Sequence, residues 1–310
     1  MLRIWQKIWK KISNNGINSW FLRLLLDMPK YLNLKTLLNY RLLFSVMAVF
    51  VLFSACSPER KLATSYAKSK HDIALLILPT DMVYKDNLNK EGISNTNPST
   101  IDSLLFANSK FLKRVSDSIF LETYINSLSD ELKLYGYKIY FDADSDDFLT
   151  NNTSGYIIDI AQLQLEEYLK PVYDEAAYHD SMIYQDFWLN ALNLNSWYEI
   201  SGMNDSQKTK KMLYASETAA DYFNGKFKFN LLTEEVTYQY TIDTIALNDV
   251  YELAAFAGKK YASYIFDYIM NLEIRKQLPA SSQPYKYMHF DRESGRIEPA
   301  YDYRFTPLYN

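Results

Sequence analysis

Two segments of the chain repeat their apolar residues at the spacing of a helix. The first covers about residues 110–135, and the second covers about residues 248–277. In both, apolar side chains recur every three or four positions, which places them on one face of a helix. Gly136 follows the first segment, where a residue in the left-handed conformation can end a helix, and Pro279 follows the second. We therefore predict two main helices, each with one buried face.

Small residues recur at every fourth position within the second predicted helix. Ala254, Gly258 and Ala262 form a stripe along one side of it. Because glycine and alanine take little room, such a stripe lets another backbone approach closely. We expect this helix to pack through the stripe against a β-sheet.

Several other segments carry the patterns of β-strands. Residues 73–78 form a continuous apolar run that a proline ends, which predicts a buried strand. Residues 137–141 are predicted to form a second strand. Apolar and polar residues then alternate over 157–166 and over 192–200, as they do in strands with one buried face.

Asn224-Gly225 is the strongest short signal for a hairpin turn in the chain. We therefore predict that strands over 211–223 and 226–230 flank this turn. Residues 236–242 alternate as well and are predicted to pair with the second of these strands.

The elements come in the order strand, helix, several strands, helix, which is typical of an α+β fold. We predict a mixed, mostly antiparallel sheet with the two main helices packed on one face. Residues 72–279 would form a single domain, because no linker rich in Gly, Ser or Pro divides them. Residues 280–310 are aromatic, hold three prolines and lack a helical period, which predicts an extended tail. Such a tail either packs across the domain as a strap or binds a partner by adding a strand.

The first 55 residues differ from the rest of the chain in charge. They hold eight basic residues and one acidic residue, which gives a net charge of +7. The whole chain carries −4, so residues 56–310 carry −11. A basic leader ahead of an acidic body is typical of an exported protein. It does not suit nucleic-acid binding, which needs Lys and Arg clustered on the folded part.

The leader ends in an uncharged apolar run, Leu42 to Ala55, directly before the only cysteine of the chain, Cys56. As a helix this run would span about 21 Å, which is short of a hydrocarbon core of about 30 Å. The sequence Leu-Phe-Ser-Ala-Cys resembles the lipobox of bacterial lipoproteins, with Phe53 where leucine is usual. The alternative is a short transmembrane anchor with an incidental cysteine.

The lipobox resemblance implies that signal peptidase cuts between Ala55 and Cys56 and that Cys56 carries acyl chains such as palmitate. Two or more chains anchor a protein stably. In such lipoproteins an Asp after the cysteine implies retention in the inner membrane, and here Ser57 follows it. We therefore expect a lipid anchor on the periplasmic side of the outer membrane, with residues 56–71 as a lipidated tether.

The predicted leader and signal peptide together cover residues 1–55, which is long for a signal. Either translation starts at Met28, which leaves a signal of ordinary length, or residues 1–27 form a helix on the membrane surface.

The strand that ends at Leu78-Pro79 and the run Leu-Tyr-Gly-Tyr-Lys-Ile over 134–139 carry a likeness in arrangement. Over 72–275 the chain resembles the periplasmic domains of the curli-secretion lipoprotein family and the TolB amino-terminal domain. Those domains begin with a buried strand ending near proline, run through a helix into a Gly-then-strand step, and close with a helix. The resemblance implies the same α+β arrangement here.

The sequence offers little for catalysis or for binding a metal. Its histidines, His71, His179 and His289, lie far apart, and no Gly-x-Ser-x-Gly elbow or glycine-rich phosphate loop occurs. The acidic residues over 142–147 have part of the spacing of a calcium loop but lack its Gly and Glu, so we predict a solvated acidic loop. We predict no catalytic residue, no metal and no cofactor; the alternative is a hydrolase with an unrecognised site.

Aromatic residues are abundant, with 27 tyrosines in the chain. Around the middle strands lie Tyr184, Trp188, Trp197 and Tyr198. Such side chains either pack half-buried in a sheet or stack on sugars and anchor protein partners. Four Asp-Ser or Asp-Thr pairs followed by an apolar residue resemble the acceptor motif for O-glycans in some bacterial envelopes. The candidate acceptors are Ser103, Ser118, Ser181 and Thr244.

Membrane anchoring without a catalytic constellation predicts a non-enzymatic assembly or scaffold component of an outer-membrane-associated complex. Its partners would be the membrane, through the lipid on Cys56, and another envelope protein, and nucleic acid is not expected. The alternative is an envelope lipoprotein that binds a glycan or another ligand through its aromatic residues.

Overall fold

The computed structural model describes residues 57–69, 73–89, 98–203, 211–230, 232–279, 286–300 and 304–308. The chain divides into two compact units, Met1–Ser57 and Pro58–Asn310. The predicted signal peptide, its cleavage site at Ala55 and the lipid attachment at Cys56 lie outside the described residues, as does His71. The helices and strands belong to the second unit.

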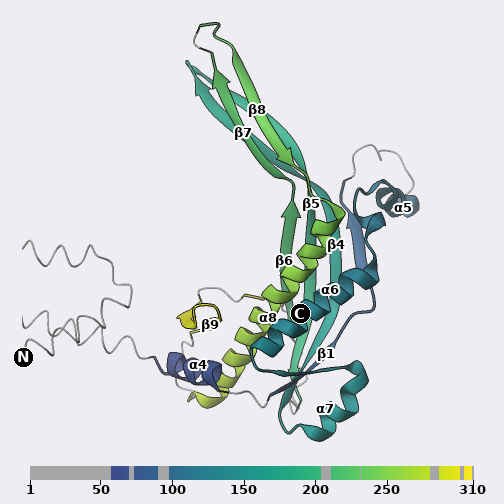
Figure 1. Ribbon diagram of the computed structural model, residues 1–310, viewed down its shortest axis with the longest axis vertical. Helices are drawn as coiled ribbons and strands as arrows, with labels where there is room; N and C mark the ends of the chain where they lie inside the picture. Colours follow the sequence, from purple (N-terminus) through teal and green to yellow (C-terminus); the bar gives the residue numbers. More distant parts are fainter. Residues whose placement is uncertain are drawn as a thin grey trace, which may run out of the picture. The chain divides into compact units, whose positions relative to one another are not determined.

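Figure 1 shows the helices and strands of this unit. The helices are α4 (Pro58–Lys68), α5 (Pro98–Asn108), α6 (Asp117–Leu134), α7 (Ser145–Asn151) and α8 (Leu247–Gln277), with the short 3-10 turns η1 (Leu112–Arg114) and η2 (Asp142–Asp144). The strands are β1 (Ala74–Leu78), β2 (Val83–Asn87), β3 (Lys138–Phe141), β4 (Gly155–Tyr178), β5 (Ser181–Gly202), β6 (Met212–Ala220), β7 (Tyr222–Phe229), β8 (Val236–Asp243), β9 (Met288–Asp291), β10 (Arg296–Pro299) and β11 (Thr306–Leu308).

Among the described residues, seven strands form one sheet in the order β11-β6-β5-β4-β1-β3, with β2 paired to β4. β1 runs parallel to β3 and β4, and β2 runs parallel to β4. β4, β5, β6 and β11 are antiparallel neighbours, and the long β4–β5 ladder makes this kind of pairing dominant. The predicted α+β fold with a mixed, mostly antiparallel sheet is therefore confirmed.

Helices α6 and α8 cover one face of this sheet. Leu163 and Leu165 of β4 are fully buried there, as are Leu192 and Leu194 of β5. Burying such side chains stabilises a fold by roughly 1.5–3 kcal/mol each. The short helix α7 covers the opposite face at the β1–β3 end, where Phe148 packs against both strands. The two main helices lie on one face as predicted, and α7 is a cover that the sequence pattern did not predict.

At Gly258, the small-residue stripe of α8 approaches a helix and not the sheet. A Cβ atom added at Gly258 would lie 2.5 Å from the carbonyl oxygen of Tyr124 and 3.0 Å from the amide nitrogen of Leu128, both in α6. Only a residue without a side chain lets the two helices come this close. The prediction of packing against a sheet is wrong, because a periodic pattern shows that a face is buried but not what buries it.

Asn224-Gly225 does not form the predicted hairpin turn. Both residues lie within β7, which pairs with β8 along its whole length. A Cβ atom at Gly225 would collide with the ring and hydroxyl of Tyr238 on β8. The glycine therefore makes room for an aromatic ring. The turn prediction is wrong because glycine within a strand serves close packing as well as turns.

The chain bends instead at Asp221, between β6 and β7. The buried carboxylate of Asp221 accepts hydrogen bonds from the backbone N–H of Asn190 on β5 and of Ile245 ahead of α8, both at 2.9 Å. The side-chain amide of Asn190 donates to it as well, at 2.5 Å. Hydrogen bonds to a carboxylate are stronger than neutral ones, so one side chain ties β5, β7 and α8 together.

The predicted lipidated tether, residues 56–71, is for most of its length a helix packed on the rest of the unit. In α4, Ala63 is fully buried, and the ring of Tyr66 lies 5.6 Å from that of Phe266 on α8. The hydroxyl of Tyr66 also shares a hydrogen bond of 2.9 Å with that of Tyr137. Polar composition did not reveal this helix, because its apolar residues recur at helical spacing among polar ones. The attachment to a lipid stays a prediction.

The predicted extended tail has more regular structure than expected. β9 and β10 form a hairpin, and β11 pairs with β6 at the edge of the sheet. Asn271 of α8 pairs with the backbone of Met288 through hydrogen bonds of 2.7 and 2.8 Å. One turn earlier, Asp267 accepts a hydrogen bond from the backbone of Phe290 at 2.9 Å and lies 2.6 Å from Nδ1 of His289. The described part of the tail is thus a strap fastened to α8.

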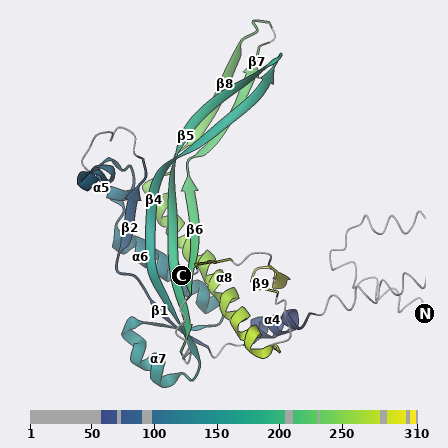
Figure 2. The same cartoon turned by 180° about the vertical axis from the view of Figure 1, so that it is seen from behind.

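β4 and β5 continue beyond the rest of the sheet as a two-stranded ladder that ends in a turn at His179. β7 and β8 pack as a second layer on one side of this ladder (Figures 1 and 2). We call residues 168–190 together with β7 and β8 the arm, and the remainder of the second unit the body. At about 3.3 Å per residue, the ladder of the arm is roughly 35 Å long.

Candidate functional site

Aromatic side chains join the two layers of the arm. The ring of Phe187 on β5 lies 4.5 Å from that of Phe223 on β7 and 4.9 Å from that of Tyr240 on β8. Tyr238 donates a hydrogen bond of 2.9 Å to Asp174 on β4, and burial together with this carboxylate raises the pKa of Tyr238 to about 12. Tilted ring pairs of this kind hold layers in a preferred arrangement. The arm is therefore a two-layer element and not a bare hairpin.

The other face of the arm's β4–β5 ladder carries large exposed aromatic side chains. Tyr173, Tyr184 and Trp188 expose 72%, 60% and 61% of their surfaces, and we call these three residues the aromatic band. Asp186 stands opposite Tyr173 across the ladder. Glu175 likewise stands opposite Tyr184. Because opposite residues of a ladder have their Cβ atoms about 5 Å apart, the rings of the band alternate with carboxylates.

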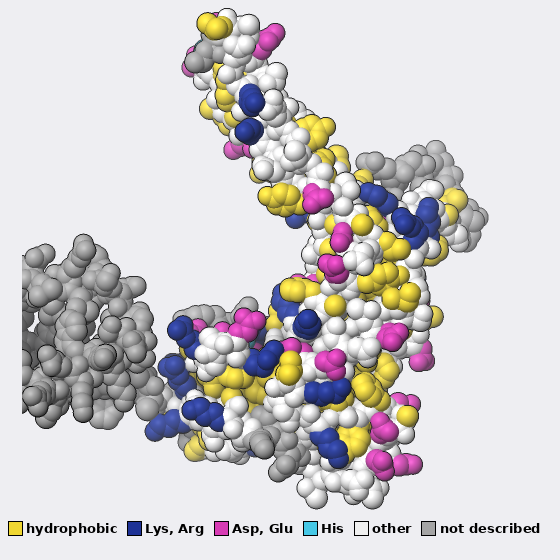
Figure 3. Space-filling view, in the orientation of Figure 1, with side chains coloured by type: hydrophobic (Ala, Val, Ile, Leu, Met, Phe, Trp, Pro, Cys, Tyr) yellow, Lys and Arg dark blue, Asp and Glu magenta, His cyan; other side chains and the backbone are white. Residues whose placement is uncertain are grey.

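The aromatic band lies on the same face of the strands that α6 and α8 cover in the body. Trp188 precedes Leu192 and Leu194 on β5 by an even number of residues, and side chains two apart share a face of a strand. Figure 3 shows hydrophobic side chains on the arm as well as on the body. Exposed groups of large aromatic residues are typical of surfaces that bind another molecule.

A second candidate is a cavity of about 300 Å³ at the start of β4, lined in part by Tyr156, Glu273 and Lys276. The hydroxyl of Tyr156 donates to Glu273 at 2.5 Å. The ammonium of Lys276 lies 2.8 Å from the same carboxylate and 3.1 Å from the hydroxyl. Because these three groups satisfy one another, none of them is poised as a free base. The cluster is a closed ion-pair network between a strand and a helix.

The core of the body holds three tyrosine side chains in contact. Tyr124 of α6 and Tyr198 of β5 share a hydrogen bond between their hydroxyls. The ring of Tyr261 on α8 lies 6.4 Å from that of Tyr124 and 6.0 Å from that of Tyr198. Burial raises the pKa of all three hydroxyls well above the ordinary value of tyrosine. They therefore stay neutral and connect the two helices to the sheet.

The structure separates the aromatic residues that the sequence places near the middle strands. Tyr198 is buried in the core, whereas Trp197 lies on the opposite face of the sheet with its ring 5.3 Å from that of Tyr214. Only Tyr184 and Trp188 share a surface. The third member of the aromatic band, Tyr173, was missed, because β4 was predicted to end near residue 166. Alternation of exposed and half-buried residues up to Tyr178 could have revealed it.

The four candidate acceptors for O-glycans all lie at the surface but not together. They are Ser103 in α5, Ser118 in the first turn of α6, Ser181 at the tip of the arm and Thr244 between β8 and α8. Exposure is what attachment requires, and the modification itself stays a prediction.

The acidic segment 142–147 is not the predicted loop. Its first residues form η2, and Asp146 and Asp147 lie in the first turn of α7, where carboxylates interact favourably with the helix dipole. Acidic composition alone did not distinguish a loop from a helix start. Across the described ranges, no group of three or more His, Cys, Asp or Glu side chains could hold a metal ion.

Within the part of the chain that the structure describes, no helix combines the length and the apolar character needed to cross a membrane. The sequence matches no protein-family model and no curated protein.

Proposed function

We propose that the protein is a membrane-anchored envelope lipoprotein that acts as a non-enzymatic assembly component of an outer-membrane-associated complex. A lipid on Cys56 would hold it at the periplasmic side of the outer membrane, and the aromatic band of the arm would bind a protein partner. The observation that carries the proposal is the exposure of Tyr173, Tyr184 and Trp188 together on one face of a two-layer arm.

The position of α4 supports a short link between the lipid and the body. α4 begins at Pro58, two residues after Cys56. Two residues of extended chain reach about 7 Å, so a lipidated Cys56 would hold α4 close to the bilayer surface. Because Tyr66 of α4 packs on Phe266 of α8, the body would be held there as well.

Helix α8 separates the contact between α4 and the body from the arm. The arm is tied to Ile245, just ahead of α8, whereas α4 contacts Phe266, 21 residues later. At about 1.5 Å per residue, these two points are roughly 30 Å apart along the helix. Figures 1 and 2 show α4 and the arm at different ends of α8. An anchored body would therefore present the aromatic band away from the bilayer surface, within reach of a partner in the aqueous compartment.

The chemistry of the aromatic band favours a protein partner. Trp and Tyr side chains bury large areas at a low cost in side-chain entropy and dominate binding energy at protein interfaces. Asp186 and Glu175 stand between the rings. A matching surface would place Lys or Arg against these carboxylates, which would steer association and fix the register of the complex.

Photo-crosslinking in cells that express the full-length chain tests the arm. A crosslinking amino acid at position 184 should attach to a protein partner, and the Trp188→Ala substitution should remove that product. Position 256 on α8 is the matched control, because Phe256 exposes 55% of its surface and Tyr184 exposes 60%. Equal crosslinking from positions 184 and 256, or none from position 184, would show that the arm does not bind a protein partner.

The anchor is tested separately with the Cys56→Ala variant. We expect this variant to remain uncleaved or to leave the membrane fraction. Normal processing and normal fractionation of the variant would contradict the lipid anchor, whatever the arm does.

A further inference from the structure

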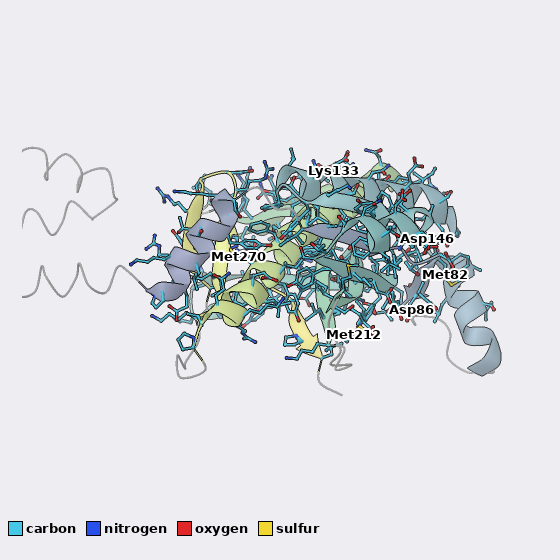
Figure 4. All side chains as sticks on the ribbon, turned by 90° about the horizontal axis from the view of Figure 1, so that it is seen from below. Met82, Asp86, Lys133, Asp146, Met212 and Met270 are labelled. Atoms are coloured by element: carbon cyan, nitrogen blue, oxygen red, sulfur yellow. The ribbon has the colours of Figure 1, made fainter. Side chains whose placement is uncertain are left out.

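The sheet of the body has one face that α6 and α8 do not cover. Figure 2 shows the strands in front of both helices. In Figure 4, Lys133 of α6 and Met212 of β6 lie at opposite sides of the unit. Because Leu192 and Leu194 of β5 point to the helices, the odd-numbered residues that follow Leu192 on this strand, beginning with Asn193, point to the uncovered face.

Three neighbouring strands place polar and aromatic side chains together on this face. We use the name polar face for six of these residues, namely Glu166, Asn193, Asn195, Trp197, Tyr214 and Thr218. The register places Asn193 between Glu166 and Thr218. It also places Trp197 directly beside Tyr214.

The side chains of the polar face hold one another in place. The amide group of Asn193 donates to Glu166 at 3.3 Å and to Asn195 at 2.8 Å. Its carbonyl oxygen accepts a hydrogen bond from Thr218 at 3.0 Å, and Tyr214 donates to Asn195 at 2.5 Å. Bonds between two side chains are only about 10–15% of the hydrogen bonds in a folded protein. Their concentration here gives planar donors and acceptors a fixed orientation before any ligand arrives.

An aromatic platform adjoins this network. The rings of Trp197 and Tyr214 lie 5.3 Å apart at an angle of 50°, and both are half-buried. β2 widens the same face, because Tyr84 is in register with Gln164 and exposes 50% of its surface. With about 4.8 Å between strands, the four strands β2, β4, β5 and β6 give a surface roughly 14 Å across. That width suits an oligosaccharide better than a single sugar.

The charge of the polar face selects among ligands. Glu166 is the only charged residue of the six, and Asp86 on β2, which is exposed and in register with Glu166, adds a second carboxylate to the same face. None of these residues is basic. Nucleic acids and other anionic polymers need Lys or Arg to neutralise them. An apolar partner would take the carboxylates of Glu166 and Asp86 out of water and offer them no hydrogen bond, which is costly for a charged group. A neutral ligand rich in hydroxyls matches best, because its hydroxyl groups can donate to the carboxylates and to the second lone pair of an amide oxygen, and can also bond to the hydroxyl of Thr218.

We propose that the polar face binds a neutral oligosaccharide. Its hydroxyls would bond to Glu166, Asn193 and Thr218, while the buried Asn195 holds Asn193 and Tyr214 in place from below. The apolar face of one sugar ring would rest on Trp197 or Tyr214. This site is separate from the aromatic band, because Trp197 and Trp188 lie on opposite faces of β5. The proposal of oligosaccharide binding can therefore be confirmed or refuted independently of the proposed protein partner of the arm.

Calorimetric titration of the full-length protein with chitohexaose, in a detergent without a sugar headgroup, tests the site. We expect binding with a dissociation constant of about 10 μM to 1 mM. Trp197→Ala should weaken it about tenfold or more, and Thr218→Val, at an exposed position where the fold tolerates change, should weaken it about threefold. Trp188→Ala is the matched control and should bind like the unmodified protein. Melting temperatures measured alongside identify any variant that fails to fold.

Four outcomes would overturn the proposal. The first is that chitohexaose, cellohexaose and maltohexaose all fail to bind the unmodified protein at millimolar concentration. The second is that binding survives unchanged in folded Trp197→Ala and Thr218→Val variants. The third is that Trp188→Ala weakens binding as much as Trp197→Ala. The fourth is that a hyaluronan hexasaccharide, which is anionic, binds as tightly as the neutral ligand.

Discussion

The body and the arm are built from the same two long strands, yet they bury opposite faces of those strands. In the body, Leu192 and Leu194 of β5 lie under α6 and α8. In the arm, Trp188 shares the face of those leucines and is exposed, while Phe187 on the other face lies under β7 and β8. The layer that covers a strand, and not the strand itself, decides which side chains become interior.

The two covers also differ in how tightly they pack. At Gly258 in the body, the obstacle to an added Cβ atom is the backbone of α6. At Gly225 in the arm, the obstacle is the side chains of Tyr238 and Phe223. A side chain can move aside, whereas the backbone of a packed helix cannot, so we expect the body to set the stability and the arm to tolerate change.

The largest expected effect is that of Gly258→Ala in the body. The new methyl group would force α6 and α8 apart, and overpacking of this kind costs about 3 kcal/mol of unfolding free energy. Gly225→Ala in the arm is the matched control and should cost about 1 kcal/mol or less, because Tyr238 can shift. Urea unfolding followed by circular dichroism measures both. Equal losses of unfolding free energy in the two variants would mean that the body and the arm are packed equally tightly.

The second-largest loss of stability is expected at Asp221, which connects the body to the arm. Asp221→Ala would leave the N–H groups of Asn190 and Ile245 without their acceptor, which should cost about 2 kcal/mol. We also expect limited proteolysis to cut near the arm's base in this variant. The control is Asp243→Ala at the exposed end of β8, which should leave stability nearly unchanged. A proteolysis pattern that is the same in both variants would argue against a joint at Asp221.

Alkaline pH should weaken the body through its buried hydroxyls. Burial raises the pKa of Tyr124 and Tyr198 above that of the unfolded chain, so their contribution to stability is complete below about pH 10 and is lost as the pH rises further. Each buried tyrosine should cost about 1 kcal/mol of unfolding free energy for each pH unit above that point. Unfolding measured at pH 8 and pH 11 checks this, and Tyr198→Phe should reduce the slope. A slope unchanged by that substitution would point to groups elsewhere.

The smallest effect on stability is expected at the surface of the arm. Trp188→Ala removes a mostly exposed side chain, so it should change the unfolding free energy by about 0.5 kcal/mol or less. Thermal unfolding measures this change. A loss of the crosslinked product in this variant would then reflect lost binding and not lost folding. A large loss of stability would show that the aromatic band is part of the arm's structure and not a free surface.

Much of the fold followed from local patterns in the sequence. The helical period predicted α6 and α8, and the apolar run that Pro79 ends predicted β1. In the arm, the pairing of residues 226–230 with 236–242 was predicted and is confirmed. The β4–β5 ladder of the arm escaped prediction, since apolar residues such as Met182 and Phe187 occupy both of its faces. A strand covered by aromatic residues on one side and exposing them on the other shows no alternation of apolar and polar residues.

The sequence by itself determined α6, α8 and β1, and it carries the resemblance to a lipobox at Cys56, because period and short motifs are local properties. Only the tertiary structure decided what covers each face. It placed Gly258 against α6, docked Tyr66 on α8 and gathered Glu166, Asn193 and Tyr214 from three strands. These choices depend on contacts between residues far apart in the chain, where many partners suit the same apolar or polar pattern and only packing selects one.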